Sequence, residues 1–383
     1  MIYFDSAATS LLRPPCVAQA VLQAMGTFAS SSRGAYAASL AAARAVYEAR
    51  ERIAGLFGAA DASWVAFTSN VTEALNIALK GLLGPGDGVI ATVLDHNSVL
   101  RPLYELEQEG VQLHLVGADA DGMPDYGAIE RLLAEDASIR AVVTTHASNL
   151  TGNLVDIHRI GQMCARYDCR FIVDTAQTAG VFPVAMGPDH IDIVAFTGHK
   201  TLLGPQGTGG LCVREGVRLR TWKSGGSGIQ TFDHVHPAVM PAHLEAGTLN
   251  AHGIAGLAAG VAYLQERGID CSRSRELSLA RQFYEGVRMM PEIRLYGDFS
   301  SPYRAPIVSL NIGDMPSAAV SDILSTDYEI CTRAGGHCAP LMHEHFGTRE
   351  QGMVRFSFSH LNREEEVAAA LQAVREIAAE SEQ

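Results

Sequence analysis

The sequence predicts an α/β protein with a large domain built on a mostly parallel sheet and a smaller α+β domain. Three observations support this fold class. The chain has 383 residues, which is more than one ordinary core accommodates. Short β-rich runs alternate with helical patterns in its middle part, as in parallel sheets covered by helices. Near Asn250 this alternation ends, and two helical stretches precede the next β-rich run.

The β-rich runs between residues 88 and 215 are expected to form the large sheet. Several are continuously apolar, as strands covered on both faces should be. Helical patterns lie between them, for example Ile129–Leu133 and Ile157–Tyr167. Polar residues cluster where the runs end, and ligands bind at the carboxyl ends of parallel strands. The runs are GVIATVLDH, VQLHLVG, IRAVVTTHASN, CRFIVDTAQ, IDIVAFTGHK and GTGGLCVRE.

The predicted large domain comprises residues 16–248, and the predicted small domain comprises residues 1–15 and 249–383. In the small domain we expect two helices, two strands and a last helix. These are Ile254–Arg267, Arg275–Met289, the runs PIVSLNI and GMVRFSFS, and Arg363–Glu380.

Charge and composition exclude several classes of protein. The 29 basic and 42 acidic side chains give a net charge of −13, which argues against a nucleic-acid or anionic-membrane partner. No apolar run approaches the roughly 20 residues that a membrane span needs, and no export signal is recognisable. The 7 cysteines have no framework spacing and are expected to be reduced thiols. We therefore expect a cytoplasmic protein that interacts with neither nucleic acid nor membrane.

A lysine and an aspartate follow two of the apolar runs. Most lysines are solvated surface residues, but a cleft at a strand end lowers an amine's pKa and favours Schiff-base formation by Lys200. Asp174 ends CRFIVD, where a carboxylate needs a partner. A protonated pyridine nitrogen is one such partner, as in enzymes that use pyridoxal 5'-phosphate (PLP). The alternative role of Asp174 is to cap a helix.

A phosphate site is predicted in FTSNVTEALNIALKG. Asn70 or Thr72 can cap a helix that runs to about Lys80 and stops at Gly81. The free N–H groups and the dipole of such a helix start attract anions. Thr197 and His199 could add side-chain donors, although serine or threonine before a helix is common and is weak support alone.

An ordered set of motifs resembles the class V aminotransferase family, and within it the cysteine desulfurases and selenocysteine lyases, with a group II-like short connection after the cysteine. The resemblance runs from Tyr3 to about Leu361 and implies the fold type I of PLP-dependent transferases. The motifs are IYFDSAATS, TSNVTEALN, LDHNSVLRP, THASNLTG, VDTAQTAG, TGHK, EAGTLN and RAGGHCAP.

The resemblance implies a PLP site. Lys200 would hold the cofactor covalently, Asp174 would pair with the ring nitrogen, Gln177 would reach the ring hydroxyl and His96 would stack on the ring and handle protons. Asn149 would lie near the ring hydroxyl and the substrate. The residues implied at the phosphate are Val71 through its backbone, Thr72, Thr197, His199, and Gly247 and Thr248 from the second subunit of a homodimer.

The resemblance also implies a substrate site and a nucleophile. Arg355 would bind the carboxylate of an amino acid, cysteine or selenocysteine, with Arg333 beside it. The thiolate of Cys338 would attack the substrate sulfur, leaving alanine and an enzyme persulfide for a sulfur-acceptor protein. Nearby cations such as Arg333 and His337 would favour a thiolate. Gly336 departs from group II relatives, which often have another histidine there.

Three other interpretations are open. His337, Cys338, His343 and His345 superficially resemble zinc ligands, but PLP chemistry accounts for the first two, so no metal is expected. A selenocysteine lyase or another PLP-dependent C–S lyase would share these motifs. A non-catalytic scaffold or sulfur-relay partner is the alternative from another class, and the presence of Lys200, Asp174 and Cys338 argues against it.

Overall fold

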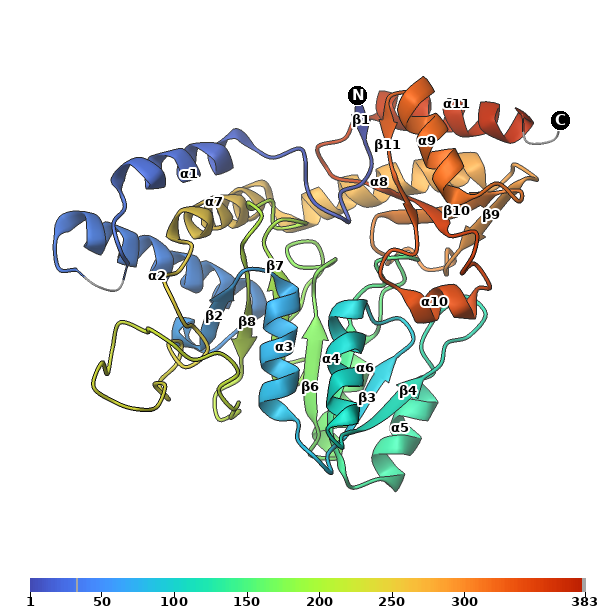
Figure 1. The fold of residues 1–383 in the computed structure, drawn as a ribbon. Helices are drawn as coiled ribbons and strands as arrows, with labels where there is room; N and C mark the ends of the chain where they lie inside the picture. Colours follow the sequence, from blue (N-terminus) through green and yellow to red (C-terminus); the bar gives the residue numbers. More distant parts are fainter. Residues whose placement is uncertain (32–33, 381–383) are drawn as a thin grey trace.

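The computed structural model describes residues 1–31 and 34–380, which form a larger and a smaller lobe (Figure 1). The larger lobe contains a seven-stranded sheet in the order β2-β8-β7-β6-β5-β3-β4. Neighbouring strands from β7 through β4 are parallel, and β8 is antiparallel to both β7 and β2. The predicted fold class, with its mostly parallel sheet, is confirmed. The strands are β2 (Val65–Thr68), β3 (Gly88–Thr92), β4 (Gln112–Val116), β5 (Ile139–Thr145), β6 (Arg170–Asp174), β7 (Ile193–Thr197) and β8 (Gly209–Val213).

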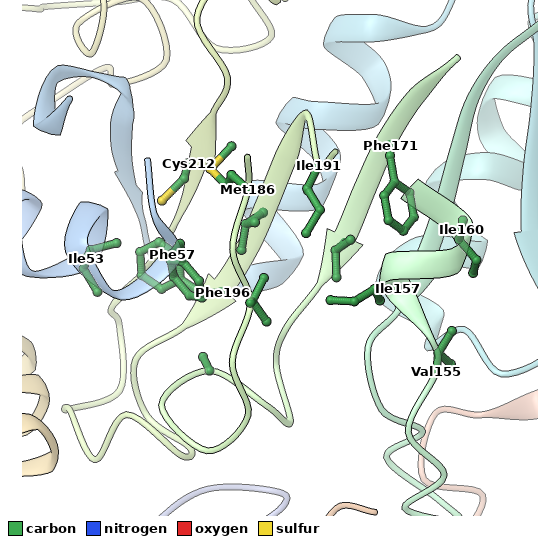
Figure 2. Close-up of a cluster of buried hydrophobic side chains, with 14 of the residues drawn as sticks. Ile53, Phe57, Val155, Ile157, Ile160, Phe171, Met186, Ile191, Phe196 and Cys212 are labelled. Carbon is green, nitrogen blue, oxygen red and sulfur yellow. The ribbon is translucent and has the colours of Figure 1, made fainter. Parts of the chain in front are cut away.

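Side chains along the central strands alternate between two buried clusters, one on each face of the sheet. In β6, Phe171 and Val173 lie in one cluster and Ile172 lies in the other. Figure 2 shows part of the first cluster, where Phe171 lies near Ile157 and Ile160. This alternation explains why the central strands carry apolar side chains at consecutive positions. The first cluster contains side chains of α2 (Ala37–Phe57), α5 (Tyr126–Glu135), α6 (Ile157–Arg166) and α7 (Ala251–Arg267), and the second those of α3 (Val71–Leu82) and α4 (Asn97–Gln108).

The strand order reverses between β3 and β5. From β3 the chain passes outward to the edge strand β4, then returns to β5 and continues through β6 and β7 in the other direction. Loops leaving the carboxyl ends of β3 and β5 therefore diverge and leave room for a ligand. His96 follows β3, Asn149 follows β5, Asp174 ends β6 and Lys200 follows β7.

The smaller lobe has a four-stranded antiparallel sheet in the order β12-β13-β10-β9, with a buried cluster of its own. The first strand of the chain pairs in parallel with β11, which brings the N-terminal segment to this lobe. The elements are β1 (Ile2–Tyr3), α8 (Ile269–Val287), β9 (Ile293–Tyr296), β10 (Ile307–Ile312), α9 (Ser317–Asp327), β11 (Ile330–Cys331), β12 (Arg333–Gly335), α10 (Pro340–His345), β13 (Met353–Ser357) and α11 (Glu364–Glu380).

Helix α7 follows the predicted domain boundary but packs with the larger lobe. It lies against α1 (Pro15–Thr27) and α2, and its Ile254, Leu257 and Val261 belong to the cluster beneath the large sheet. The boundary at residue 248 stays a prediction. Across residues 1–31 and 34–380, no helix has the length and apolar character to span a bilayer.

Candidate active site

Lys200 and Asp174 lie together at the carboxyl ends of β6 and β7. Asp174 is 2% exposed, and burial raises its pKa, against a hydrogen bond that its Oδ1 accepts from the N–H of Ala176 at 2.8 Å and the charge of Lys200. Burial also lowers the pKa of the half-buried Lys200 to about 8, although Asp174 opposes this shift. The segment after Asp174 forms turns, so this carboxylate does not begin a helix. The pair offers a readily deprotonated amine beside a carboxylate that favours a cationic partner.

His96 is held as a neutral imidazole at the start of α4. Its Nδ1 accepts a hydrogen bond from the backbone N–H of Ser98 at 3.0 Å, so the ring proton is on Nε2. Burial, followed by the charges of Lys200 and Arg333, lowers the pKa of His96 to about 3. The site therefore has a flat, uncharged ring beside its cations.

The N-terminal segment fixes the turn that carries Lys200. The backbone N–H of Ser10 donates to the carbonyl of His199 at 2.9 Å, and its hydroxyl donates to the carbonyl of Lys200 at 2.7 Å. The Nδ1 of His199 lies 3.0 Å from the hydroxyl of Thr9, and burial lowers the pKa of this histidine to about 4. A segment about 190 residues earlier in the chain thus holds the turn that carries the lysine.

The start of α3 has free backbone donors, as a phosphate site requires. The side chain of Asn70 caps the helix by accepting from the N–H of Glu73 at 3.0 Å. Among the described residues, none accepts a hydrogen bond from the N–H of Val71, which is buried, or of Thr72, which is exposed. The hydroxyl of Thr197, 1% exposed at the end of β7, is buried without a partner.

Asn149 joins the site to the cysteine loop. Its Nδ2 donates to the carbonyl of His337 at 2.7 Å, while its Oδ1 is buried without a partner among the described residues. Gln177, three residues after Asp174, is buried, and its Nε2 donates to the carbonyl of Ala7 at 3.1 Å. An orphaned amide oxygen in a buried position favours a ligand that can donate a hydrogen bond.

Two arginines of the small-lobe sheet extend the charge of the site. Arg355 on β13 is fully buried, and its Nη1 donates to the carbonyl of Asn149 at 2.8 Å. Its Nη2 lies 2.9 Å from Oδ1 of Asp5, and its Nε has no partner among the described residues. Arg333 lies opposite it on β12 and is half-buried. Arg355 thus joins β13 to the loop after β5 that carries Asn149, and Arg333 lies beside it in the same sheet.

Cys338 is exposed in a short turn that contacts α4. Its carbonyl accepts from the N–H of Asn97 at 2.9 Å, next to His96. His337 is 2% exposed, and both His337 and Cys338 have left-handed backbones, with φ of 49° and 55°. The turn leads directly into α10, which lies beside the larger lobe (Figure 1).

Gly247 and Thr248 are the predicted site residues that the chain does not bring to Lys200. Both are exposed, and Gly247 donates its N–H to the carbonyl of Gly226 at 2.8 Å. The segment is anchored by Glu245, which forms a buried ion pair with Arg50. The role of Gly247 and Thr248 toward a second copy of the chain stays a prediction.

Each histidine near Cys338 has its own hydrogen-bond partner, and the rings of His337 and His343 stack with their centroids 6.0 Å apart. His337 Nε2 lies 3.1 Å from the carbonyl of Arg333, His343 Nδ1 lies 2.8 Å from the hydroxyl of Thr348, and His345 Nε2 lies 2.8 Å from the carbonyl of Asp119. Across residues 1–31 and 34–380, no three metal-ligating side chains form a cluster.

Sequence reasoning does not identify two acids near the site, the buried Asp95 and the half-buried Asp5. Asp95 precedes His96 and accepts from the N–H groups of Thr92 at 2.7 Å and Thr145 at 2.6 Å, which ties β3 to β5. Burial raises its pKa to about 7, against these hydrogen bonds. The cluster DHNS at a strand end could have identified Asp95. Asp5 has no local signal, because its partner Arg355 lies at the other end of the chain.

Comparisons with known proteins match the whole chain. The family model described as aminotransferase class-V matches residues 2–370. A probable cysteine desulfurase of Methanothermobacter thermautotrophicus is 34% identical, over 98% of this chain and 94% of that protein. The cysteine desulfurase IscS of Photobacterium profundum is 28% identical, over 98% and 92% of the two chains.

Solved structures agree. The apo structure of cysteine desulfurase from Thermococcus onnurineus superimposes with a TM-score of 0.92 at 31% identity, covering 99% of this chain and 94% of that one. The cysteine desulfurase CsdA of Escherichia coli gives a TM-score of 0.87 at 28% identity, with coverages of 99% and 94%. The resemblance read from the motifs is confirmed, and the chain belongs to the class V aminotransferase family, whose members are PLP-dependent enzymes.

Proposed function

We propose that this chain is a PLP-dependent cysteine desulfurase that converts L-cysteine to L-alanine and receives the sulfur on Cys338. One observation carries the proposal. The backbone carbonyl of the exposed Cys338 accepts a hydrogen bond from the N–H of Asn97, the residue after His96, and so holds this thiol next to the site. Of the chain's 7 cysteines, this is the one joined to the site.

The described side chains fit PLP. Asp174 would take the ring nitrogen, because burial raises the pKa of this carboxyl against the charge of Lys200, and a buried carboxylate needs a further partner. The orphaned hydroxyl of Thr197 and the free N–H groups of Val71 and Thr72 would take the phosphate. His96 would stack on the ring and Gln177 would reach its hydroxyl. When bound, the cofactor withdraws electrons from the amino acid and labilises its bonds at Cα and Cβ.

The arginines would orient the amino acid. Arg355 keeps N–H groups free after its bonds to Asn149 and Asp5, and a guanidinium binds a carboxylate with two parallel hydrogen bonds. Arg333 adds a second charge on the same face of the sheet. The orphaned Oδ1 of Asn149 is an acceptor beside them. This arrangement supports an α-amino acid as the substrate class.

Cys338 would then accept the sulfur. Its thiolate attacks the sulfur of the substrate, so that an S–S bond forms while the Cβ–S bond breaks and its electron pair stays with carbon. Protonation of that carbon yields alanine. The short turn limits how far the resulting persulfide can move, so we propose that an acceptor protein comes to this exposed position to collect it.

Assembly and location are part of the proposal. Exposed apolar side chains on α1, α2 and the segment after β8 fit burial against a second copy, which would bring Gly247 and Thr248 to a neighbouring phosphate site. Among them, Leu22 is 74%, Met25 65% and Phe232 97% exposed. The free thiols, including the reactive one, fit a reducing, cytoplasmic compartment.

Two measurements test the function. Borohydride reduction of the loaded protein followed by peptide mapping should place the cofactor on Lys200, one of only 3 lysines in the chain. Cys338→Ala should keep the visible absorbance and lose alanine formation from cysteine, whereas Cys271→Ala, at the other exposed cysteine, should keep both. Full cysteine turnover by Cys338→Ala would contradict the proposal. If this variant has a higher kcat/KM for selenocysteine than for cysteine, the protein is a selenocysteine lyase.

A further inference from the structure

The carboxylate-binding Arg355 already has an acidic partner from the far end of the chain. Asp5 Oδ1 lies 2.9 Å from Arg355 Nη2, and the arginine side chain is only 1% exposed. The other terminal nitrogen donates to the carbonyl of Asn149 at 2.8 Å. The guanidinium is therefore held at two of its five N–H groups, from two different segments.

Asp5 itself is fixed by the strand that carries Arg355. The N–H of Ser357 donates to the carbonyl of Phe4 at 2.7 Å, and the N–H of Ala7 donates to the Ser357 hydroxyl at 2.9 Å. The side chain of Phe4 is fully buried in the small-lobe core. The position of Asp5 thus follows from the fold of the N-terminal segment on β13.

The edge of the guanidinium that remains free includes Nε, which is buried and has no hydrogen-bond partner in residues 1–31 and 34–380. A long arginine side chain loses considerable rotational entropy when it is held in one geometry. Because Asp5 and Asn149 already hold it, a substrate carboxylate meets a donor pair that is oriented before binding. We propose that Asp5 is a positioning residue, which orients Arg355 for the α-carboxylate of the substrate.

Charge and orientation predict opposite effects of removing Asp5. Loss of the negative charge alone would strengthen the attraction of Arg355 for a second carboxylate. Loss of the hydrogen-bond acceptor would free the guanidinium and weaken binding. Asp5→Asn removes the charge but keeps an oxygen that can accept from Nη2, whereas Asp5→Ala removes both.

The test rests on the proposed function but does not use turnover. Calorimetric titrations of the holoenzyme would compare L-alanine with ethylamine, which is alanine without its carboxylate. We expect Asp5→Ala to weaken alanine binding about tenfold, as loss of a charge-assisted hydrogen bond does, and to leave ethylamine binding unchanged. Asp5→Asn should bind alanine at least as tightly as the unaltered protein. The control Asp322→Asn, at an exposed acid of α9, should bind alanine with the affinity of the unaltered protein.

Several results would overturn the positioning role. The role is contradicted if Asp5→Ala binds alanine at least as tightly as the unaltered protein does. It is also contradicted if Asp5→Ala loses the same affinity for alanine and for ethylamine. If Asp5→Ala does not fold, Ser357→Ala replaces it, because that hydroxyl holds the Asp5 segment on β13; it must also weaken alanine selectively. An unaltered holoenzyme that binds ethylamine and alanine equally would instead refute carboxylate recognition by Arg355 in the proposed function.

Discussion

Arg333 and Arg355 lie directly opposite each other on the antiparallel strands β12 and β13. Opposite residues of such a pair point to the same face, where two like charges repel. Asp5 compensates Arg355, but no described residue accepts a hydrogen bond from, or forms an ion pair with, the side chain of Arg333. A half-buried, unpaired cation facing another cation is a stability cost that an anionic ligand removes.

Arg333→Gln is therefore expected to weaken substrate binding without lowering the stability of the fold. The KM for cysteine should rise about tenfold, since a hydrogen bond to a charged group is lost, while kcat changes less. The free energy of unfolding should not fall, because the repulsion of Arg355 is relieved. Steady-state kinetics and urea unfolding measure the two quantities. Arg349→Gln, at an arginine whose side chain is 76% exposed, should change neither. A loss of stability in Arg333→Gln would show that Arg333 has a structural partner instead.

Lys200 should set the pH dependence of cofactor loading. Only the neutral amine attacks an aldehyde, and burial lowers the pKa of Lys200 to about 8. The loading rate of cofactor-free protein should thus rise about tenfold per pH unit below pH 8 and level off above it, as the amine loses its proton. Stopped-flow absorbance would record this profile. Lys80→Ala, on α3, should leave the profile unchanged, whereas a plateau appearing only near pH 10 would contradict a desolvated amine.

Asn149→Ala should loosen the cysteine loop. His337 and Cys338 have left-handed backbones, which cost of order 1–3 kcal/mol each and persist only where contacts enforce them. The bond from Asn149 Nδ2 to the His337 carbonyl is one such contact. We expect faster hydrogen exchange at residues 336–339 and a kcat lowered about tenfold, because the thiol is held less often in its reacting position.

A matched variant separates this effect from general destabilisation. Gln108→Ala alters an exposed amide at the end of α4, the helix that contacts the loop. It should leave both exchange and kcat as they are. Unchanged exchange in Asn149→Ala would mean that the bond from Asn97 to Cys338 suffices to hold the turn.

The fold could be predicted where the chain carries a local pattern. The interiors of runs such as Arg170–Asp174 and Ile193–Thr197 are apolar at consecutive positions because both faces of the sheet are covered, and this pattern needs no knowledge of distant residues. The helix start at Asn70 was also readable, since the cap and the helix are neighbours in sequence. Gly81 lies within that helix, one residue before its end, which is the usual uncertainty of a boundary.

Other features depend on contacts that sequence spacing does not reveal. The position of α7 after residue 248 does not reveal that this helix packs against α1 and α2. Asp5 and Arg355 are brought together by pairing of the N-terminal segment with the small-lobe sheet. The approach of Asn149 to the cysteine loop likewise requires both lobes to be assembled.

Arg50 and Glu245 should control the stability of the segment that carries Gly247 and Thr248. The ion pair has two contacts, Nη1–Oε1 at 2.7 Å and Nη2–Oε2 at 2.8 Å, and both side chains are 8% exposed. The N–H of Phe67 also donates to Glu245 at 2.7 Å. Arg50→Met would leave this carboxylate buried and unpaired, which lowers the free energy of unfolding by about 3–5 kcal/mol.

Replacing both partners tests whether the cost comes from the unpaired charge. Arg50→Met combined with Glu245→Leu should recover much of the loss, because an apolar pair of similar volume can replace a buried ion pair. Urea unfolding of the single and double variants measures this, and Arg281→Met, in an exposed pair on α8, should have little effect.

If the double variant regains stability but still loses the cofactor faster on dialysis, the anchored segment serves the cofactor site. Equal losses in the single and double variants would mean that Arg50 acts through its packing on the ring of Phe67, 4.9 Å away.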